Sequence, residues 1–315
     1  MLHIKLRLAI SQLFLGASVM IKFSNGHQFE YMTASGALGF DGRGWPWERV
    51  LGFFLPKFFA PTLFTNVIKT LTCLPRKGNL RMHNPLGCIR PIFRGGKIVG
   101  IVNAVGLTNP GIDWWVKNIG PKVDSSKLAL VGSIFGTNEE ILIMAEMLNR
   151  FDFVALEINV SCPNSGEKLS ENTAQAIKAC RLAKGASRFP IIVKLSVAND
   201  ALRIAQAVDG IAEAISINSV PWNIVFPNKR SPLKHLGGGG VSGKIAQPFE
   251  WELVDRLNGV TDIPVIGPGV WNFEDIRIMR ENLRVKAIGF GSVFVPKPLC
   301  PTGCVRRDIK ARSLK

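Results

Sequence analysis

Short runs of apolar residues alternate with helix-like segments from about residue 30 to residue 290 of this 315-residue chain. Several of the runs are continuously apolar, which is typical of strands that are covered on both faces. The pattern predicts eight strands, at residues 32–35, 64–72, 128–134, 154–160, 190–195, 214–218, 264–266 and 287–290.

Amphipathic segments between these runs predict helices at residues 138–149, 172–184, 200–208, 247–258 and 272–281. Asn138 is the expected N-cap of the first, because Glu139 and Glu140 follow it in the first turn. Repeated strand-then-helix units predict a parallel sheet, and eight strands favour an α/β fold with a single (β/α)8 TIM barrel. No Gly-x-Gly-x-x-Gly fingerprint follows the first strand, which argues against a dinucleotide-binding Rossmann domain.

The barrel is expected to span residues 20–315, and the stretch 73–100 is expected to be an irregular excursion over its mouth. Residues 1–19 are a separate segment in which Lys5 and Arg7 precede an apolar stretch, Leu8 to Val19. This segment resembles a weak signal peptide or an amphipathic anchor, and it is too short to span a bilayer. We expect it to be dispensable, as an extension ahead of Met20.

Composition narrows the class of protein. Hydrophobic residues make up 47% and charged residues 20%, which excludes a disordered chain. The net charge is 39 − 23 = +16, but it is spread without dense basic runs, so nucleic acid is not the expected ligand. The six cysteines do not form a disulfide framework, and Cys300 and Cys304 lack the partners of a zinc site. Free thiols in a reducing compartment, the cytoplasm, are expected, with no metal.

Candidate chemistry follows the predicted strands, where active sites of (β/α)8 barrels lie. The fourth strand ends in EINVSCPN (157–164), which brings a thiol and two amides together; the alternative is a buried cysteine beside a capping Asn. Lys69 and Lys194 follow two other strands, and two such lysines indicate an electron-rich or anionic ligand. Asn218 follows the sixth strand, and a loop before the third strand contains Asn103 and Asn109. These asparagines either cap turns or recognise a planar ligand such as a pyrimidine.

Glycines cluster in the last part of the chain, in the run 237–243 and after the seventh and eighth strands. Phosphate sites in these barrels commonly use the loops after strands seven and eight, where backbone N–H groups approach the anion. The clusters therefore indicate a phosphorylated cofactor.

Several motifs together resemble those of the dihydroorotate dehydrogenases: ASG (34–36), KTLTCLPRKGN (69–79), NAVGLTNPG (103–111), INVSCPN (158–164), VKLS (193–196), INS (217–219), GGGGVSG (237–243) and GFGS (289–292). They occur in the family's order over about residues 30–295. The resemblance implies an FMN cofactor across the barrel mouth. It also implies oxidation of (S)-dihydroorotate to orotate in pyrimidine biosynthesis, an oxidoreductase reaction on a CH–CH bond.

The same resemblance assigns residue roles. Cys162 would remove a proton from C5 of the substrate while hydride passes from C6 to flavin N5, and Lys69 would lie near both flavin and substrate. The flavin would contact Ala34, Ser35, Gly36, Lys69 and Lys194, and its phosphate would contact Gly239, Gly240, Gly267, Gly269, Gly291 and Ser292. The substrate would contact Asn103, Gly106, Leu107, Asn159, Asn164, Asn218 and Ser219.

Departures from the family pattern leave alternatives open. The loop after Asn164 lacks a Pro-Gly pair, IGPGVW replaces a glycine-glycine pair, and the insertions around Trp45 and at 221–236 are atypical. The alternatives are an oxidoreductase that acts on another dihydropyrimidine, an RNA dihydrouridine synthase-like enzyme, and a non-catalytic flavoprotein. The RNA activity is disfavoured because the chain ends soon after the eighth strand. A cysteine at 162 is similar to the class 1 enzymes, in which a homodimer is usual. The electron acceptor is open among fumarate, NAD through a partner subunit, and quinone.

Overall fold

Eight parallel strands form a barrel in the computed structural model, which describes residues 20–161 and 173–314. Around the sheet the order is β10-β9-β8-β7-β4-β3-β14-β13. Ile215 N donates a 3.0 Å hydrogen bond to Pro264 O, and Ile215 bridges in parallel to Val265, so the two outer strands meet. The strands are β3 (Tyr31–Thr33), β4 (Thr65–Val67), β7 (Leu130–Ile134), β8 (Ala155–Asn159), β9 (Ile191–Leu195), β10 (Ala212–Ile217), β13 (Ile266–Gly267) and β14 (Ala287–Phe290). The predicted (β/α)8 fold is confirmed.

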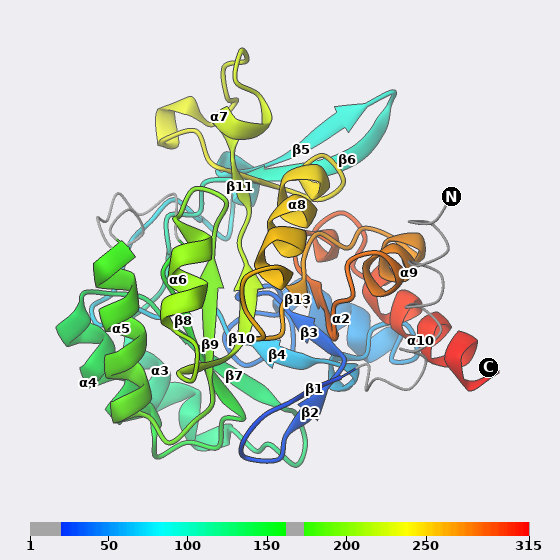
Figure 1. Ribbon diagram of the computed structural model, residues 1–315. Coiled ribbons are helices and arrows are strands. Elements are labelled where there is room, and N and C mark those ends of the chain that lie inside the picture. Colours follow the sequence, from blue (N-terminus) through cyan, green and yellow to red (C-terminus); the bar gives the residue numbers. More distant parts are fainter. Residues whose placement is uncertain (1–19, 162–172, 315) are drawn as a thin grey trace, which may run out of the picture.

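Apolar side chains on both faces explain why these runs form strands. All residues of β7, β8 and β9 are buried. One face fills the barrel interior, where Met32, Val67, Val131 and Ile192 pack together. A hairpin of β1 (Ile21–Lys22) and β2 (Gln28–Phe29) adds apolar residues to this interior cluster and closes one end of the barrel (Figure 1). The second predicted strand is shorter than expected, because the chain leaves regular pairing after Val67.

Helices follow the strands and cover the barrel (Figure 1). They are α2 (Pro46–Phe54), α3 (Ile112–Asn118), α4 (Asn138–Leu148), α5 (Thr173–Ala186), α6 (Ala201–Ala207), α7 (Trp222–Val225), α8 (Gln247–Asn258), α9 (Phe273–Glu281) and α10 (Cys300–Ser313). Short 3-10 turns are η1 (Pro61–Leu63), η2 (Pro85–Gly87), η3 (Gly120–Lys122), η5 (Lys234–Leu236) and η6 (Ser292–Phe294). No helix in the described ranges is long and apolar enough to cross a membrane.

The expected N-cap of α4 is wrong by one residue. Thr137 is the N-cap, and its hydroxyl accepts a 3.3 Å bond from Glu140 N while Glu140 Oε2 accepts from Thr137 N at 2.8 Å. This reciprocal capping box satisfies two N–H groups that the helix leaves unpaired. Asn138 is instead buried in the first turn, where its amide contacts Gln175.

A second sheet, which the sequence did not predict, stands over one end of the barrel (Figure 1). Its order is β11-β12-β6-β5, built from β5 (Ile89–Arg94), β6 (Lys97–Asn103), β11 (Val220–Pro221) and β12 (Gly240–Ser242). The expectation that residues 73–100 are irregular is therefore wrong for the part after Cys88. The glycine run is not a free loop either, because β12 pairs antiparallel with β6.

Candidate functional site

A cavity of about 470 Å³ opens at the carboxyl ends of the barrel strands, beneath the second sheet. It collects most of the residues that the sequence singled out: Ala34, Ser35, Gly36, Lys69, Asn103, Gly106, Leu107, Asn159, Lys194, Asn218, Ser219, Gly269, Gly291 and Ser292. Cys162 and Asn164 lie outside the described residues, as do residues 1–19. The loops that carry the predicted site thus converge on one place.

Three of the predicted phosphate glycines do not line this cavity. Gly240 lies in β12 opposite Asn103, and a side chain on Gly239 would place its Cβ 2.6 Å from Asn103 O. These two glycines let β12 approach β6 closely. Gly267 faces α9, since a Cβ there would lie 2.7 Å from Met279 Sδ. Their positions suit the support of the site rather than contact with a ligand.

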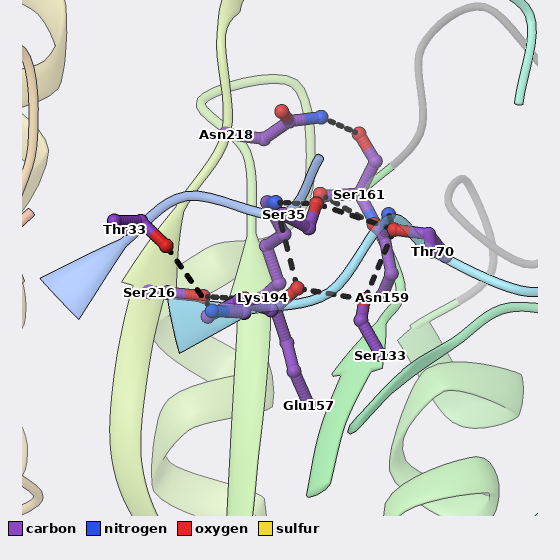
Figure 2. A network of polar contacts seen from close by, with 11 residues as sticks. Thr33, Ser35, Thr70, Ser133, Glu157, Asn159, Ser161, Lys194, Ser216 and Asn218 are labelled. Atoms are coloured by element: carbon purple, nitrogen blue, oxygen red, sulfur yellow. Dashed lines mark hydrogen bonds and ion pairs between the residues drawn. The ribbon is translucent and has the colours of Figure 1, made fainter. Parts of the chain in front are cut away.

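A buried charged pair, Lys194 and Glu157, is among the residues that line the cavity, and Figure 2 shows its surroundings. Lys194, 5% exposed on β9, has its Nζ 3.5 Å from Glu157 Oε1 of the neighbouring strand β8. The same ammonium donates to Ser35 Oγ at 2.8 Å, in the loop after β3. Glu157 also accepts from Ser133 Oγ at 2.9 Å and Ser216 Oγ at 2.8 Å. The carboxylate is well partnered, so it can fix the position of the buried lysine.

Hydroxyls and amides extend this network toward the cavity (Figure 2). Thr70 Oγ1 lies 2.9 Å from Ser133 Oγ and donates to Ser35 Oγ at 3.2 Å. Asn159 Oδ1 accepts from Ser161 Oγ at 2.9 Å. Asn218 Nδ2 donates to Ser161 O at 3.0 Å, which ties the end of β10 to the end of β8. The network fixes the amides of two strand ends, so a planar ligand would meet preset donors and acceptors.

Gly36 explains how Lys69 reaches the cavity. Its φ is +76°, a conformation that favours glycine, and a Cβ there would lie 2.6 Å from Lys69 Cδ. The lysine stem therefore crosses the bare backbone of the loop after β3. Lys69 N also donates to Gly39 O at 2.8 Å, which fixes the two loops to each other.

The insertion after β3 forms a wall that the sequence marked only as atypical. Trp45, Trp47 and Glu48, at the start of α2, line the cavity. The two indole rings stack at 5.9 Å, and Trp45 Nε1 donates to Gly36 O at 3.0 Å. Burial raises the pKa of Glu48 to about 7, although Trp45 N donates to its Oε2 at 2.8 Å and opposes the shift. The site is thus covered by aromatic rings on this side.

The cavity and its hydrogen-bond network contain further residues that the sequence did not predict. Glu157 was the detectable one, because a carboxylate inside the apolar strand ALEIN is costly to bury without a partner. Ser133, Ser216 and Glu250 carry no comparable signal. Asn109 is a structural residue: it is buried, and its Oδ1 accepts from Gly111 N at 2.9 Å within a turn. No group of acidic, His and Cys side chains in the described ranges could hold a metal ion.

Comparisons with known proteins agree on one family. The family model described as dihydroorotate dehydrogenase matches residues 61–277. A relative named dihydroorotate dehydrogenase B (NAD(+)), catalytic subunit, from Desulforudis audaxviator is 32% identical over 84% of this chain and 83% of its own length. A protein of the same name from Petrotoga mobilis is 29% identical over 78% of this chain and 77% of its own length.

Solved structures give the same fold. A crystal structure of DHODH from Eimeria tenella in complex with ferulenol matches with a TM-score of 0.65 and 15% identity, covering 94% of this chain and 85% of that one. The ligand-free form from the same organism matches with a TM-score of 0.62 and 16% identity, covering 96% and 91%. At this identity the likeness concerns the fold alone.

Proposed function

Because the chain belongs to the dihydroorotate dehydrogenase family, we propose that it oxidises dihydroorotate to orotate, with FMN as its cofactor. The observation that carries the proposal is the convergence on one cavity of Asn103 from β6, Asn159 from β8 and Asn218 just after β10. Lys69 and Lys194 also line this cavity. A pyrimidine ring presents carbonyl and N–H edges to amides of this kind, and its carboxylate suits a nearby cation.

The cavity also fits a flavin with a single phosphate. Its far wall is the pair of loops after β13 and β14, where these barrels commonly bind phosphate. Gly269 has a φ of +77°, and a methyl on Gly291 would lie 3.1 Å from Ala34 Cβ, so both loops depend on bare backbone. Ala34, Ser35, Gly36 and Lys194 would border the ring system, and Gly269, Gly291 and Ser292 would hold the phosphate.

The residues of this chain have separable tasks in the reaction. FMN, when bound, supplies the acceptor for the hydride that leaves C6 of the substrate. Cys162 would remove the proton from C5, so that one hydride and one proton leave and a C=C bond forms. The asparagines would orient the ring, and Glu157 would hold Lys194 in place through their 3.5 Å contact. The wall of Trp45 and Trp47 would exclude water from one side of the cavity.

NAD⁺ is the electron acceptor that we favour, reached through a second subunit. The relatives from Desulforudis audaxviator and Petrotoga mobilis are both named as NAD(+) catalytic subunits, and a catalytic subunit implies a companion. Fumarate and quinone remain the competing acceptors. The RNA dihydrouridine synthase-like alternative is not favoured, because the matched relatives are dihydroorotate dehydrogenases.

Two assays of the purified protein test the proposal. Denaturation should release FMN, which chromatography separates from FAD. The protein should also form orotate from dihydroorotate when an artificial electron acceptor replaces the companion subunit. Release of FAD would contradict the cofactor assignment, and bound FMN without orotate formation would contradict the substrate.

A further inference from the structure

Glu250 is a buried acid that the proposed chemistry does not use. It lies in the first turn of α8, is 2% exposed and lines the cavity. Its Oε2 has no hydrogen-bond partner. A buried carboxyl oxygen without a partner is costly, and a ligand that enters the cavity can remove that cost.

The unpartnered oxygen faces the loop after β13. A Cβ built on Gly269 would lie 2.4 Å from Glu250 Oε2, so the carboxyl lies against the bare backbone of this loop. The helix of Glu250 fixes the loop directly, because Gln247 Nε2 donates to Gly269 O at 2.8 Å and Trp251 Nε1 donates to Pro268 O at 3.2 Å. Pro268 has no N–H group, so this loop has one backbone donor fewer for an anion.

We infer that Glu250 is a ligand-binding residue of the phosphate subsite, and that its protonated carboxyl donates a hydrogen bond to the flavin phosphate beside Gly269. The inference rests on the proposed function, since it requires FMN in the cavity. The O–H of Glu250 would donate to the phosphate in place of the backbone N–H that Pro268 lacks. An ionised Glu250 would instead repel the phosphate, so binding requires the neutral acid.

The surroundings of Glu250 allow the neutral form. Burial raises its pKa to about 8, and no charged group among the described residues contributes to the shift. The other charged side chains lining the cavity are Glu48, Lys69, Glu157 and Lys194.

The charged and titratable side chains near the loop after β13, Lys244, Lys297 and Cys300, contact groups other than Glu250. Lys244 Nζ lies 3.3 Å from Asp275 Oδ1, and Lys297 Nζ lies 5.1 Å from the centre of the Trp271 ring. Cys300 Sγ contacts Trp271 O at 3.8 Å, and its hydrogen bond with Cys304 lowers the pKa of the Cys300 thiol to about 7. This thiol titrates close to the pH range of interest, so every variant that is compared must retain Cys300.

The affinity for FMN depends on pH because phosphate binding is linked to protonation of Glu250. Below pH 8 Glu250 is neutral and can donate, whereas above pH 8 it must take up a proton for the phosphate to bind. A phosphate monoester has already lost its second proton near pH 6, so its own charge is constant from pH 7 to pH 9. The affinity for FMN should therefore fall about tenfold between pH 7 and pH 9, while that for riboflavin, which lacks the phosphate, should not.

The test measures dissociation constants of FMN and riboflavin for the flavin-free protein at pH 7 and pH 9, by quenching of flavin fluorescence. In Glu250→Gln the amide still donates and no longer titrates, so FMN affinity should change less than about threefold with pH. Glu252→Gln removes a charge from the exposed face of the same helix and should behave as the wild type.

An FMN affinity of the wild type that does not vary with pH, or the same decrease in Glu250→Gln, would overturn the inference and leave the proposed function standing. A parallel decrease for riboflavin would also overturn it, because the effect would not concern the phosphate. Failure of the protein to bind either flavin would overturn both the inference and the proposed function.

Discussion

Single residues determine the chemistry at the floor of the cavity, and Lys194 and Glu157 are the pair on which the others depend. Their contact at 3.5 Å is nearly inaccessible to solvent, and Ser35, Ser133 and Ser216 complete their hydrogen bonding (Figure 2). Removing one member leaves a buried charge without its counterion, whereas removing both leaves neutral groups. We therefore expect single substitutions in this pair to destabilise the protein more than the double substitution does.

Lys194→Met should lower the free energy of unfolding of the flavin-free protein by about 3 kcal/mol or more, because Glu157 stays buried without its partner. Combining it with Glu157→Gln should recover much of that loss. Urea denaturation measures both. Lys184→Met, which removes the lysine of the half-exposed pair with Glu213, should cost about 1 kcal/mol or less. Simple additivity of the two buried substitutions would contradict this account.

Cys162→Ala should retain FMN and slow flavin reduction by dihydroorotate by about 10²–10⁴-fold, the usual contribution of a general base. Cys162→Ser should retain more activity than the alanine variant at high pH, because an assisted hydroxyl can still accept a proton. Anaerobic reduction rates at matched FMN occupancy measure this effect. A structural cysteine would instead show loss of flavin or stability without a selective kinetic change.

At the scale of elements, the pairing of β12 with β6 positions Asn103 at the cavity. Gly240 is the register partner of Asn103, and Asn103 Nδ2 donates to Gly240 O at 3.4 Å. The glycines before it allow this approach, because any side chain on Gly239 would meet the backbone of Asn103. The second sheet is thus the support of one expected substrate contact.

Gly239→Ala should raise KM for dihydroorotate by about tenfold or more while FMN occupancy stays near that of the wild type. Its Cβ would lie 2.6 Å from Asn103 O and push β6 away, at a φ of +86°. Gly238→Ala is the matched control: φ is +95°, with no atom within 4 Å of the new Cβ. Steady-state kinetics of both variants separate displacement of Asn103 from backbone strain alone. Equal KM values in the two variants would contradict the role of β12.

Elements differ in how far the sequence predicts them. The barrel strands are recognisable because both of their faces are buried, which leaves continuous apolar runs such as Ile191–Leu195. The second sheet is not, because β5 is half exposed with Arg90 and Arg94 in it, and β12 pairs with a strand 137 residues earlier in the chain. Helix α10 buries small or polar residues such as Thr302 and Asp308, so it has little apolar periodicity.

At the scale of the whole molecule, the barrel explains why residues from Ala34 to Ser292 form one site. Parallel strands bring their carboxyl ends to the same rim, so motifs far apart in the sequence become neighbours. The sequence therefore predicted most of the lining. It did not predict Glu250 or the aromatic wall of α2, because these contacts depend on how loops and helices pack over the rim.

Oxidation of dihydroorotate by the bound flavin can be observed by anaerobic mixing of the purified protein with (S)-dihydroorotate, followed by the visible absorbance of the flavin. We expect the oxidised flavin band to bleach as orotate forms in equal amount, because bound FMN would accept the hydride that leaves C6 of the substrate. Orotate alone, which has no hydride to give, is the control and should leave the band intact. A flavin that stays oxidised with dihydroorotate, yet is bleached by a chemical reductant, would contradict the account.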